Sequence, residues 1–232
     1  GICAVLKADG YGHGAVSIAR TALNNGARML AVACLAEAVI LRRAAIDAPI
    51  LVLGYTPAWQ ARDTLRHNVT ATVYDLDVAA ALSQAAADLN RPARVHVKVD
   101  TGMGRLGLLP DEVLPFVRQL ATLPRPGLTV EGIFTHFSVA DSIKPEHLAY
   151  TRAQLAVFTT VLARLQAEGI RPPLVHAANS AAMLTQPASR FDMVRLGIAL
   201  YGLAPSPAVR LPDGFRPVLS WKTQVAQVKK LP

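Results

Sequence analysis

The sequence predicts an α/β fold, a (β/α)8 barrel of the TIM type, followed by the start of a β-rich C-terminal domain. Eight apolar strand-like runs alternate with helix-compatible sequence along residues 1–204. Polar residues suited to chemistry follow the ends of several runs, and TIM barrels place their active sites at the carboxyl ends of their strands. An open, doubly wound sheet is the alternative that shares this alternation.

The expected strands are short apolar runs. They cover residues 2–6, 29–33, 50–54, 69–73, 94–99, 128–134, 174–177 and 192–196. Alanine-rich segments between them carry apolar residues at three- and four-residue spacing, which is typical of helices packed over a parallel sheet. These helices are expected at Ala36–Ala45, Val78–Leu89, Leu114–Leu123 and Ala149–Glu168.

The chain changes character after Tyr201. Four prolines fall between residues 205 and 217, and Leu219–Val228 then alternates in the manner of a half-buried strand. We therefore expect residues 1–204 to form the barrel, and residues 205–232 to form a linker and the first strand of a β-domain. Because the chain begins with glycine and stops within this strand pattern, we expect it to be a fragment of a longer protein.

Composition narrows the class of partner. The net charge of +8 is scattered, with no basic run longer than two residues, so anionic small molecules are favoured over nucleic acid. No uninterrupted apolar run reaches the length of a membrane span, so we expect no membrane partner and a cytoplasmic protein. Cys3 and Cys34 both lie in apolar runs, which favours buried free thiols, although a bridge between them stays open.

Lys7 is the first candidate for catalysis. The apolar run Ile2–Leu6 ends at this residue, and the glycine-rich segment Ala8–Gly14 follows. A lysine at the tip of a buried strand is expected to be partly desolvated, which favours the neutral amine that attacks an aldehyde. For a lone lysine, the alternative is a side chain that simply extends from the strand end into solvent.

Further polar segments follow later strands: Lys98–Arg105, Thr135–Phe137, Ala178–Ser180, Arg195–Ile198 and Tyr201. Each has a plain structural alternative. His136 could be a hydrogen-bonded core histidine, Asn179 and Ser180 a helix N-cap, and Arg195 the ion-pair partner of Asp192 or of another acid. Taken together, these segments favour one site at one end of the barrel.

The segment after the eighth strand is the usual phosphate site of a TIM barrel. Gly197 and Ile198 occupy it, and the Ser180 hydroxyl could contact the same anion. Glycine at 197 would let the backbone approach phosphate oxygens, and its alternative is a simple turn. With Lys7, this arrangement indicates an aldehyde cofactor that carries a phosphate.

Three segments, Ala4–Gly14, Asp100–Gly107 and Val194–Gly202, occur in this order and resemble the alanine racemase family of pyridoxal-phosphate enzymes. The resemblance covers essentially the whole chain. It implies interconversion of L- and D-alanine on pyridoxal 5′-phosphate, supplying D-alanine for peptidoglycan. It also implies a homodimer with shared active sites, a barrel joined to a β-domain, and no metal ion.

The resemblance also implies roles for individual residues. Lys7 would bind the cofactor as an imine and act as a base on the substrate Cα. The phosphate would be held by Tyr11, Ser180, Gly197 and Ile198. Arg195 would face the pyridine nitrogen and, since it keeps its protons, leave that nitrogen unprotonated, which favours racemisation over transamination. The remaining cofactor contacts would be His136, which orients Arg195, and Asn179.

Two further residues match the family near the substrate. Arg105 matches an arginine close to the cofactor's phenolic oxygen and the substrate carboxylate. Lys98 matches a position that is carbamylated in some members, and its alternative is an ordinary ion pair with Asp100. The second acid/base, a tyrosine from the partner subunit's β-domain, would lie beyond residue 232, so the fragment by itself is expected to racemise poorly or not at all.

Other functions stay open. Residues 10–15 fit the G-x-G-x-x-A dinucleotide fingerprint after a strand, with Glu37 following the second strand, which would suit an oxidoreductase. A non-catalytic pyridoxal-phosphate-binding barrel would share the imine lysine, and a racemase of broader specificity would share every motif. A related decarboxylase is disfavoured, because it would place a carboxylate where Arg195 stands.

Overall fold

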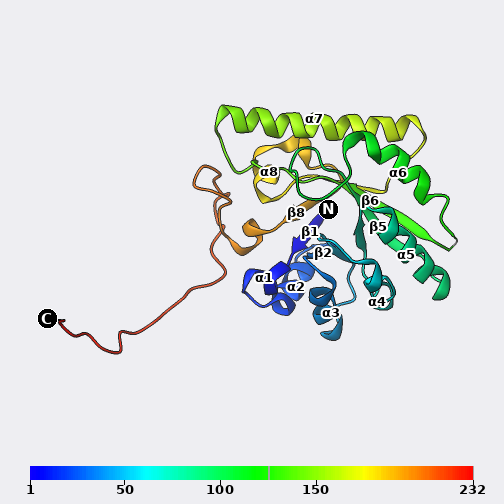
Figure 1. The fold of residues 1–232 in the computed structure, drawn as a ribbon. Helices are drawn as coiled ribbons and strands as arrows, with labels where there is room; N and C mark the ends of the chain where they lie inside the picture. The colour runs from blue at the N-terminus through cyan, green and yellow to red at the C-terminus, as the bar shows by residue number, and fades with distance from the viewer. Residues whose placement is uncertain (125, 232) are drawn as a thin grey trace.

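The strands of the computed structural model, which describes residues 1–124 and 126–231, form a closed parallel barrel (Figure 1). They are β1 (Ile2–Val5), β2 (Met29–Val32), β3 (Ile50–Val52), β4 (Ala71–Val73), β5 (Ala93–Lys98), β6 (Leu128–Phe134), β7 (Leu174–His176) and β8 (Val194–Leu196). Each overlaps one of the eight predicted runs.

Strand pairing shows how the barrel closes. Two four-stranded parallel sheets have the orders β3-β2-β1-β8 and β4-β5-β6-β7. A parallel bridge between Leu51 and Thr70 joins β3 to the residue before β4. On the other side, the Arg195 N–H donates to the Ala178 carbonyl at 2.9 Å and joins β8 to the segment after β7. The TIM-type prediction is confirmed, and the open doubly wound sheet is excluded.

Helices connect the strands and cover the outside of the barrel (Figure 1). They are α2 (Ala15–Asn24), α3 (Leu35–Arg43), α4 (Ala61–Arg66), α5 (Leu76–Asp88), α6 (Val113–Leu120), α7 (Pro145–Ala167) and α8 (Ser180–Thr185). The segment labelled α1 (Lys7–Tyr11) is not a right-handed helix, because four of its residues have φ between 51° and 62°.

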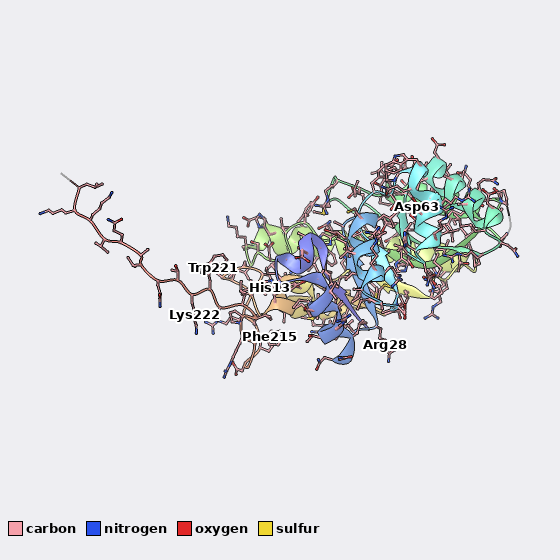
Figure 2. The ribbon with its side chains drawn as sticks, turned by 90° about the horizontal axis from the view of Figure 1, so that it is seen from below. His13, Arg28, Asp63, Phe215, Trp221 and Lys222 are labelled. Carbon is pink, nitrogen blue, oxygen red and sulfur yellow. The ribbon has the colours of Figure 1, made fainter. Side chains whose placement is uncertain are left out.

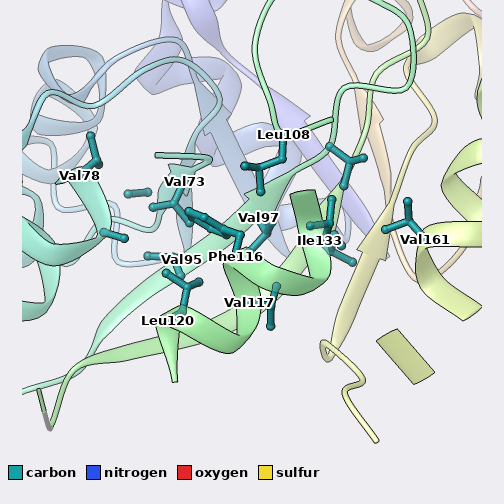
Figure 3. Packing of buried hydrophobic residues seen from close by; sticks show 14 of the residues in the cluster. Val73, Val78, Val95, Val97, Leu108, Phe116, Val117, Leu120, Ile133 and Val161 are labelled. Atoms are coloured by element: carbon teal, nitrogen blue, oxygen red, sulfur yellow. The ribbon is translucent and has the colours of Figure 1, made fainter. Parts of the chain in front are cut away.

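The largest core cluster lies between the second sheet and its covering helices. Figure 3 shows Phe116 of α6 among Val73, Val95 and Val97 of the neighbouring strands. Leu120 lies one turn further along the same face of α6, so two apolar side chains four residues apart seal this helix against the sheet. This packing fixes the strands whose carboxyl ends carry the candidate site.

Residues 219–231, at the end of the described chain, extend away from the barrel. Figure 2 shows the segment that carries Trp221 and Lys222 leaving the body of the molecule. The predicted strand Leu219–Val228 is not formed: its residues are exposed, and no strand of the described chain pairs with them. Alternation alone is insufficient here, because a strand needs a neighbour for its backbone hydrogen bonds. The assignment of this segment to a second domain stays a prediction.

The two cysteines are free. Cys3 is fully buried on β1, and burial raises the pKa of its thiol to about 12. Cys34 is exposed at the start of α3, so the prediction of two buried thiols is right for Cys3 and wrong for Cys34. Separately, none of the helices in the described part of the chain combines the length and the apolar character needed to cross a bilayer.

Candidate active site

The carboxyl ends of the strands surround two adjoining cavities of about 280 and 190 Å³. Lys7, Leu53, His136 and Arg195 line both of them. The larger cavity is also lined by the predicted phosphate-site residues Tyr11, Asn179, Ser180, Gly197 and Ile198. The smaller one adds Lys98 and Arg105. The structure therefore brings all ten predicted site residues to one end of the barrel.

Lys7 lies two residues after the end of β1, and its exposed side chain lines the larger cavity. Its Nζ lies 5.7 Å from the centre of the Tyr11 ring. The expectation of a desolvated amine is therefore wrong for Lys7, because the strand ends at Val5 and the lysine already belongs to the loop. The buried amine of this site is that of Lys98.

The loop after Lys7 is a left-handed turn. Ala8, Asp9, Gly10 and Tyr11 have φ of 51°, 52°, 62° and 54°. Non-glycine residues in this region cost about 1–2 kcal/mol each, so surrounding contacts must hold the turn. One such contact is the Asp9 carboxylate, which accepts a hydrogen bond from the Ala15 N–H at 2.8 Å.

This turn also bears on the dinucleotide alternative. In such a fold, the acidic residue after the second strand must be available to a ribose. Glu37 has both carboxylate oxygens engaged by backbone N–H groups, those of Ala8 and Ala33. The oxidoreductase interpretation therefore loses its acidic ligand.

Ser180 and Gly197 meet at the predicted phosphate end. The Ser180 Oγ accepts hydrogen bonds from the N–H groups of Gly197, at 3.0 Å, and Ala199, at 3.2 Å. A Cβ on Gly197 would lie 2.5 Å from the Tyr11 hydroxyl, so only glycine leaves room for that tyrosine. The Ser180 hydroxyl proton stays available to an acceptor in the cavity.

Asn179 serves as the N-cap of α8. Its Oδ1 accepts a hydrogen bond from the Ala182 N–H at 2.9 Å. The structural alternative for this residue is therefore correct, and Asn179 lines the larger cavity as well.

Arg195 is the buried cation of the site, with 3% of its surface exposed. Its guanidinium donates to the carbonyl oxygens of Thr135, at 2.8 Å, and Ala177, at 2.9 Å. Asp192 does not pair with it, because the Asp192 carboxylate accepts from the Val175 N–H. Burial lowers the pKa of Arg195 to about 10, so it stays protonated at neutral pH.

Two histidines complete the environment of Arg195. Its NH1 bonds the His176 Nδ1 at 2.7 Å, and its NH2 bonds the His136 Nδ1 at 3.1 Å. Since arginine can only donate, both Nδ1 atoms must accept. The His176 Nε2 then donates to the His96 Nδ1 at 2.9 Å. Burial, reinforced by Arg195, lowers the pKa of His96 to about 3 and the pKa of His136 and of His176 well below its usual value.

Lys98 points into the barrel with 4% of its surface exposed. It forms no salt bridge with Asp100, whose carboxylate instead accepts from the N–H groups of Gly102, Met103 and Gly104. Burial, together with Arg195 and Arg105, lowers the pKa of Lys98 to about 7. The ion-pair alternative is therefore wrong, and a large share of this amine is neutral at pH 7.

Tyr201 lies just after the site and is fully buried. Its hydroxyl donates to the Val5 carbonyl at 2.9 Å, and burial raises its pKa. It supports the end of β1 rather than presenting an acid or base to the cavity. Within residues 1–124 and 126–231, no three His, Cys, Asp or Glu side chains are grouped to bind a metal ion.

Comparison with known proteins shows the family of this chain. The model of the alanine racemase N-terminal domain matches residues 1–205. The chain belongs to the alanine racemase family. An alanine racemase of Symbiobacterium thermophilum is 48% identical over 230 residues, which are 99% of this chain and 60% of that protein. The chain thus spans about 60% of the length of this curated relative.

Solved structures of the alanine racemase family share the fold. The structure titled alanine racemase from Clostridium difficile 630 in complex with cycloserine superposes with a TM-score of 0.85 at 41% identity, covering 90% of this chain and 56% of that one. A histidine racemase from Leuconostoc mesenteroides subsp. sake gives a TM-score of 0.82 at 27% identity, covering 93% and 57%. The same barrel therefore occurs in racemases named for different amino acids.

His96 and His176 belong to the hydrogen-bonded network around Arg195, and the sequence motifs missed them. They lie inside the strands rather than after them. One signal was present: His96 and Lys98 are two residues apart on one strand and so share the face that points into the barrel. Polar residues on that face need partners from other strands, and this would have suggested a buried network.

Lys98→Met should change how stability depends on pH. The unfolded pKa of lysine is about 10.4, above the folded value of about 7. Between these values the unfolded chain binds more protons, so Lys98 makes stability rise with pH. The variant should be more stable than wild type near pH 6.5, and the slope of its unfolding free energy between pH 7 and 10 should be lower by about 1 kcal/mol per pH unit.

Urea denaturation at a series of pH values measures this slope. Lys144→Met, at an exposed lysine away from the cavities, is the control and should leave the slope unchanged. Parallel curves for wild type and Lys98→Met would mean that Lys98 is not buried as an amine.

Proposed function

We propose that the protein containing this chain interconverts L- and D-alanine with pyridoxal 5′-phosphate bound at Lys7. The observation that carries this proposal is one cavity lined by an exposed lysine, by the buried Arg195, which has no carboxylate partner among the described residues, and by the Ser180–Gly197 corner. The named relatives support the choice of alanine.

The residues present fit this cofactor. The Ser180 hydroxyl suits a phosphate, because its proton stays available while its oxygen accepts from the N–H groups of Gly197 and Ala199, and the corner leaves no room for a Cβ at 197. Tyr11 and Ile198 border the same corner, and Lys7 opens onto the same cavity. When bound, the cofactor would withdraw electrons from the substrate Cα and so acidify its Cα–H bond.

Protein groups would handle the proton. Lys7 would exchange a proton with the substrate Cα on one face, and the second acid/base would exchange a proton on the opposite face, so that a proton lost on one side is replaced on the other. Arg195 would donate toward the ring nitrogen, and its neutral partners leave it as a full cation at that place. Because His136 and His176 are neutral, they orient the guanidinium without competing as acids. Proton return to Cα would then be favoured over transamination.

The smaller cavity would bind part of the amino-acid substrate. Arg105 lines it and would bind the substrate carboxylate. The neutral amine of Lys98 is the form that reacts with carbon dioxide, so its depressed pKa supports carbamylation there. The carbamate would carry a negative charge between Arg105 and Arg195 and would offset their mutual repulsion.

The whole protein would complete the site. We propose a cytoplasmic homodimer in which the partner's β-domain supplies the second acid/base, and a role for the D-alanine product in peptidoglycan. A racemase of broader specificity is the second candidate, because a histidine racemase shares this barrel.

Racemisation by the full-length protein tests the proposal. With pyridoxal phosphate added, the protein should convert L-alanine to D-alanine, and chiral chromatography measures the product. L-serine and L-histidine should react at least ten-fold more slowly. Comparable rates for the three would favour the broader racemase. Cofactor attachment without turnover of any amino acid would favour a binding protein instead.

A further inference from the structure

Glu37 connects the loop after Lys7 to the second βα unit. It lies in the first turn of α3, and its Oε1 accepts a hydrogen bond from the Ala8 N–H at 2.7 Å. Its Oε2 accepts from the Ala33 N–H at 2.6 Å. The bond to Ala33 is local and resembles a capping box, in which a first-turn glutamate reaches back to a backbone N–H. The bond to Ala8 spans 29 residues and has no such local purpose.

The bond to Ala8 restrains the backbone of Lys7 itself. The Ala8 N–H belongs to the peptide group that begins at the Lys7 carbonyl. The preceding peptide group is also held, because the Leu6 carbonyl accepts from the Gly10 N–H at 2.7 Å. Leu6 is further tied to β2 by its N–H, which donates to the Ala31 carbonyl at 2.7 Å. Both peptide groups of Lys7 are therefore fixed, and Glu37 is the only side chain among these partners.

The left-handed turn explains why such a restraint is needed. Four consecutive residues from Ala8 to Tyr11 have positive φ, and three of them are not glycine. A turn of this kind relaxes toward ordinary backbone angles when its contacts are removed. Relaxation at Ala8 would rotate the neighbouring Lys7 and move its Nζ away from the cavity.

We propose that Glu37 is a positioning residue that directs Lys7 into the cavity by binding the Ala8 N–H. Glu37 lines neither cavity, so it acts through the backbone rather than on a ligand. The inference rests on the proposed function, since it supposes that Lys7 reacts with an aldehyde. It gives Glu37 a different task from the ribose contact that the dinucleotide fingerprint suggested.

Two probes separate this role from a general loss of structure. The first is 4-deoxypyridoxine 5′-phosphate, which has the ring and phosphate of the cofactor but no aldehyde. The second is pyridoxal 5′-phosphate, whose covalent attachment to Lys7 is followed by absorbance and borohydride trapping. Glu37→Ala should bind the first probe within three-fold of wild type and attach the second at least ten-fold more slowly. Glu37→Gln, which keeps one acceptor oxygen, should be intermediate.

Glu112→Ala is the matched control. Glu112 also accepts a backbone N–H at a helix start, that of Leu109 at 2.7 Å, but it lies away from both cavities. It should leave attachment and analogue binding unchanged. If Glu37→Ala lowers the affinity for the analogue and the rate of pyridoxal phosphate attachment by the same factor, or changes neither, the proposal is overturned. Circular dichroism would show whether Glu37→Ala folds. If it does not fold, the same two measurements are made on Glu37→Gln.

Amide hydrogen exchange supplies a readout that needs no cofactor. The Ala8 N–H should exchange at least ten-fold faster in Glu37→Ala than in wild type, while amides of α6 stay unchanged. If the wild-type chain fails to attach pyridoxal phosphate, the proposed function is wrong, and unchanged exchange at Ala8 would show separately that Glu37 does not hold the loop.

Discussion

Lys7→Ala is expected to abolish covalent attachment of pyridoxal phosphate at the site. Lys7 is an exposed amine of the larger cavity, which Arg195, Ser180 and Gly197 also line. Alanine removes the nucleophile and leaves the phosphate and ring contacts in place. Borohydride reduction followed by peptide mapping should find the pyridoxyl group on the Lys7 peptide of wild type, and at least 100-fold less of it in the variant.

Mapping is essential because a second amine lies nearby. Lys98 lines the adjoining cavity, and burial lowers its pKa to about 7, so it offers a neutral amine at neutral pH. Residual absorbance in Lys7→Ala with the pyridoxyl group on Lys98 would be a side reaction, whereas equal adduct on Lys98 in wild type would contradict the assignment of Lys7. Lys144→Ala is the control and should leave the adduct on Lys7 intact.

Much of the barrel could be predicted from the sequence. The eight strands are short apolar runs because both faces of a parallel strand are buried, and periodicity detects such runs well. The failure came at Leu219–Val228, where alternation described one face of a strand but could not supply its hydrogen-bonding neighbour. The left-handed turn at Ala8 was also missed, since alanine and aspartate seldom adopt positive φ.

The residues of the candidate site also fall into those that the sequence predicted and those that it did not. Residues that follow strand ends were found by motif, because the ends of a closed barrel must meet. Two histidines that lie within strands and pair across the barrel were not found. His176 and His96 are 80 residues apart, and their bond exists only because β7 and β5 both lie beside β6. Glu37 was noticed for the wrong reason, since its backbone partners depend on the conformation of the loop after Lys7.

Arg195→Lys is expected to lower the free energy of unfolding by about 2–6 kcal/mol. The arginine supplies hydrogen bonds to the Thr135 and Ala177 carbonyls and to His176 and His136. A lysine ammonium donates from one point and cannot reach this spread of acceptors. At least two buried acceptors would lose their partners, and each costs about 1–3 kcal/mol. Urea denaturation at pH 7.5 measures the loss.

Arg118→Lys is the matched control for this variant. Arg118 pairs with Glu168 in an exposed ion pair, where exchange of one cation for another should change stability by less than about 1 kcal/mol. Equal losses in the two variants would contradict the buried network around Arg195.

The tautomers of the buried histidines give a second measure of the same arginine. In wild type, the Arg195 guanidinium forces the His176 Nδ1 to accept, which places the His176 proton on Nε2 and makes the His96 Nδ1 an acceptor in turn. Nitrogen-15 NMR should therefore show both rings neutral and protonated on Nε2, in keeping with their lowered pKa values. Arg195→Lys should mix the tautomers at His176, because the geometry that imposed one of them is lost. A single unchanged tautomer would mean that the strands, and not Arg195, set the hydrogen-bond direction.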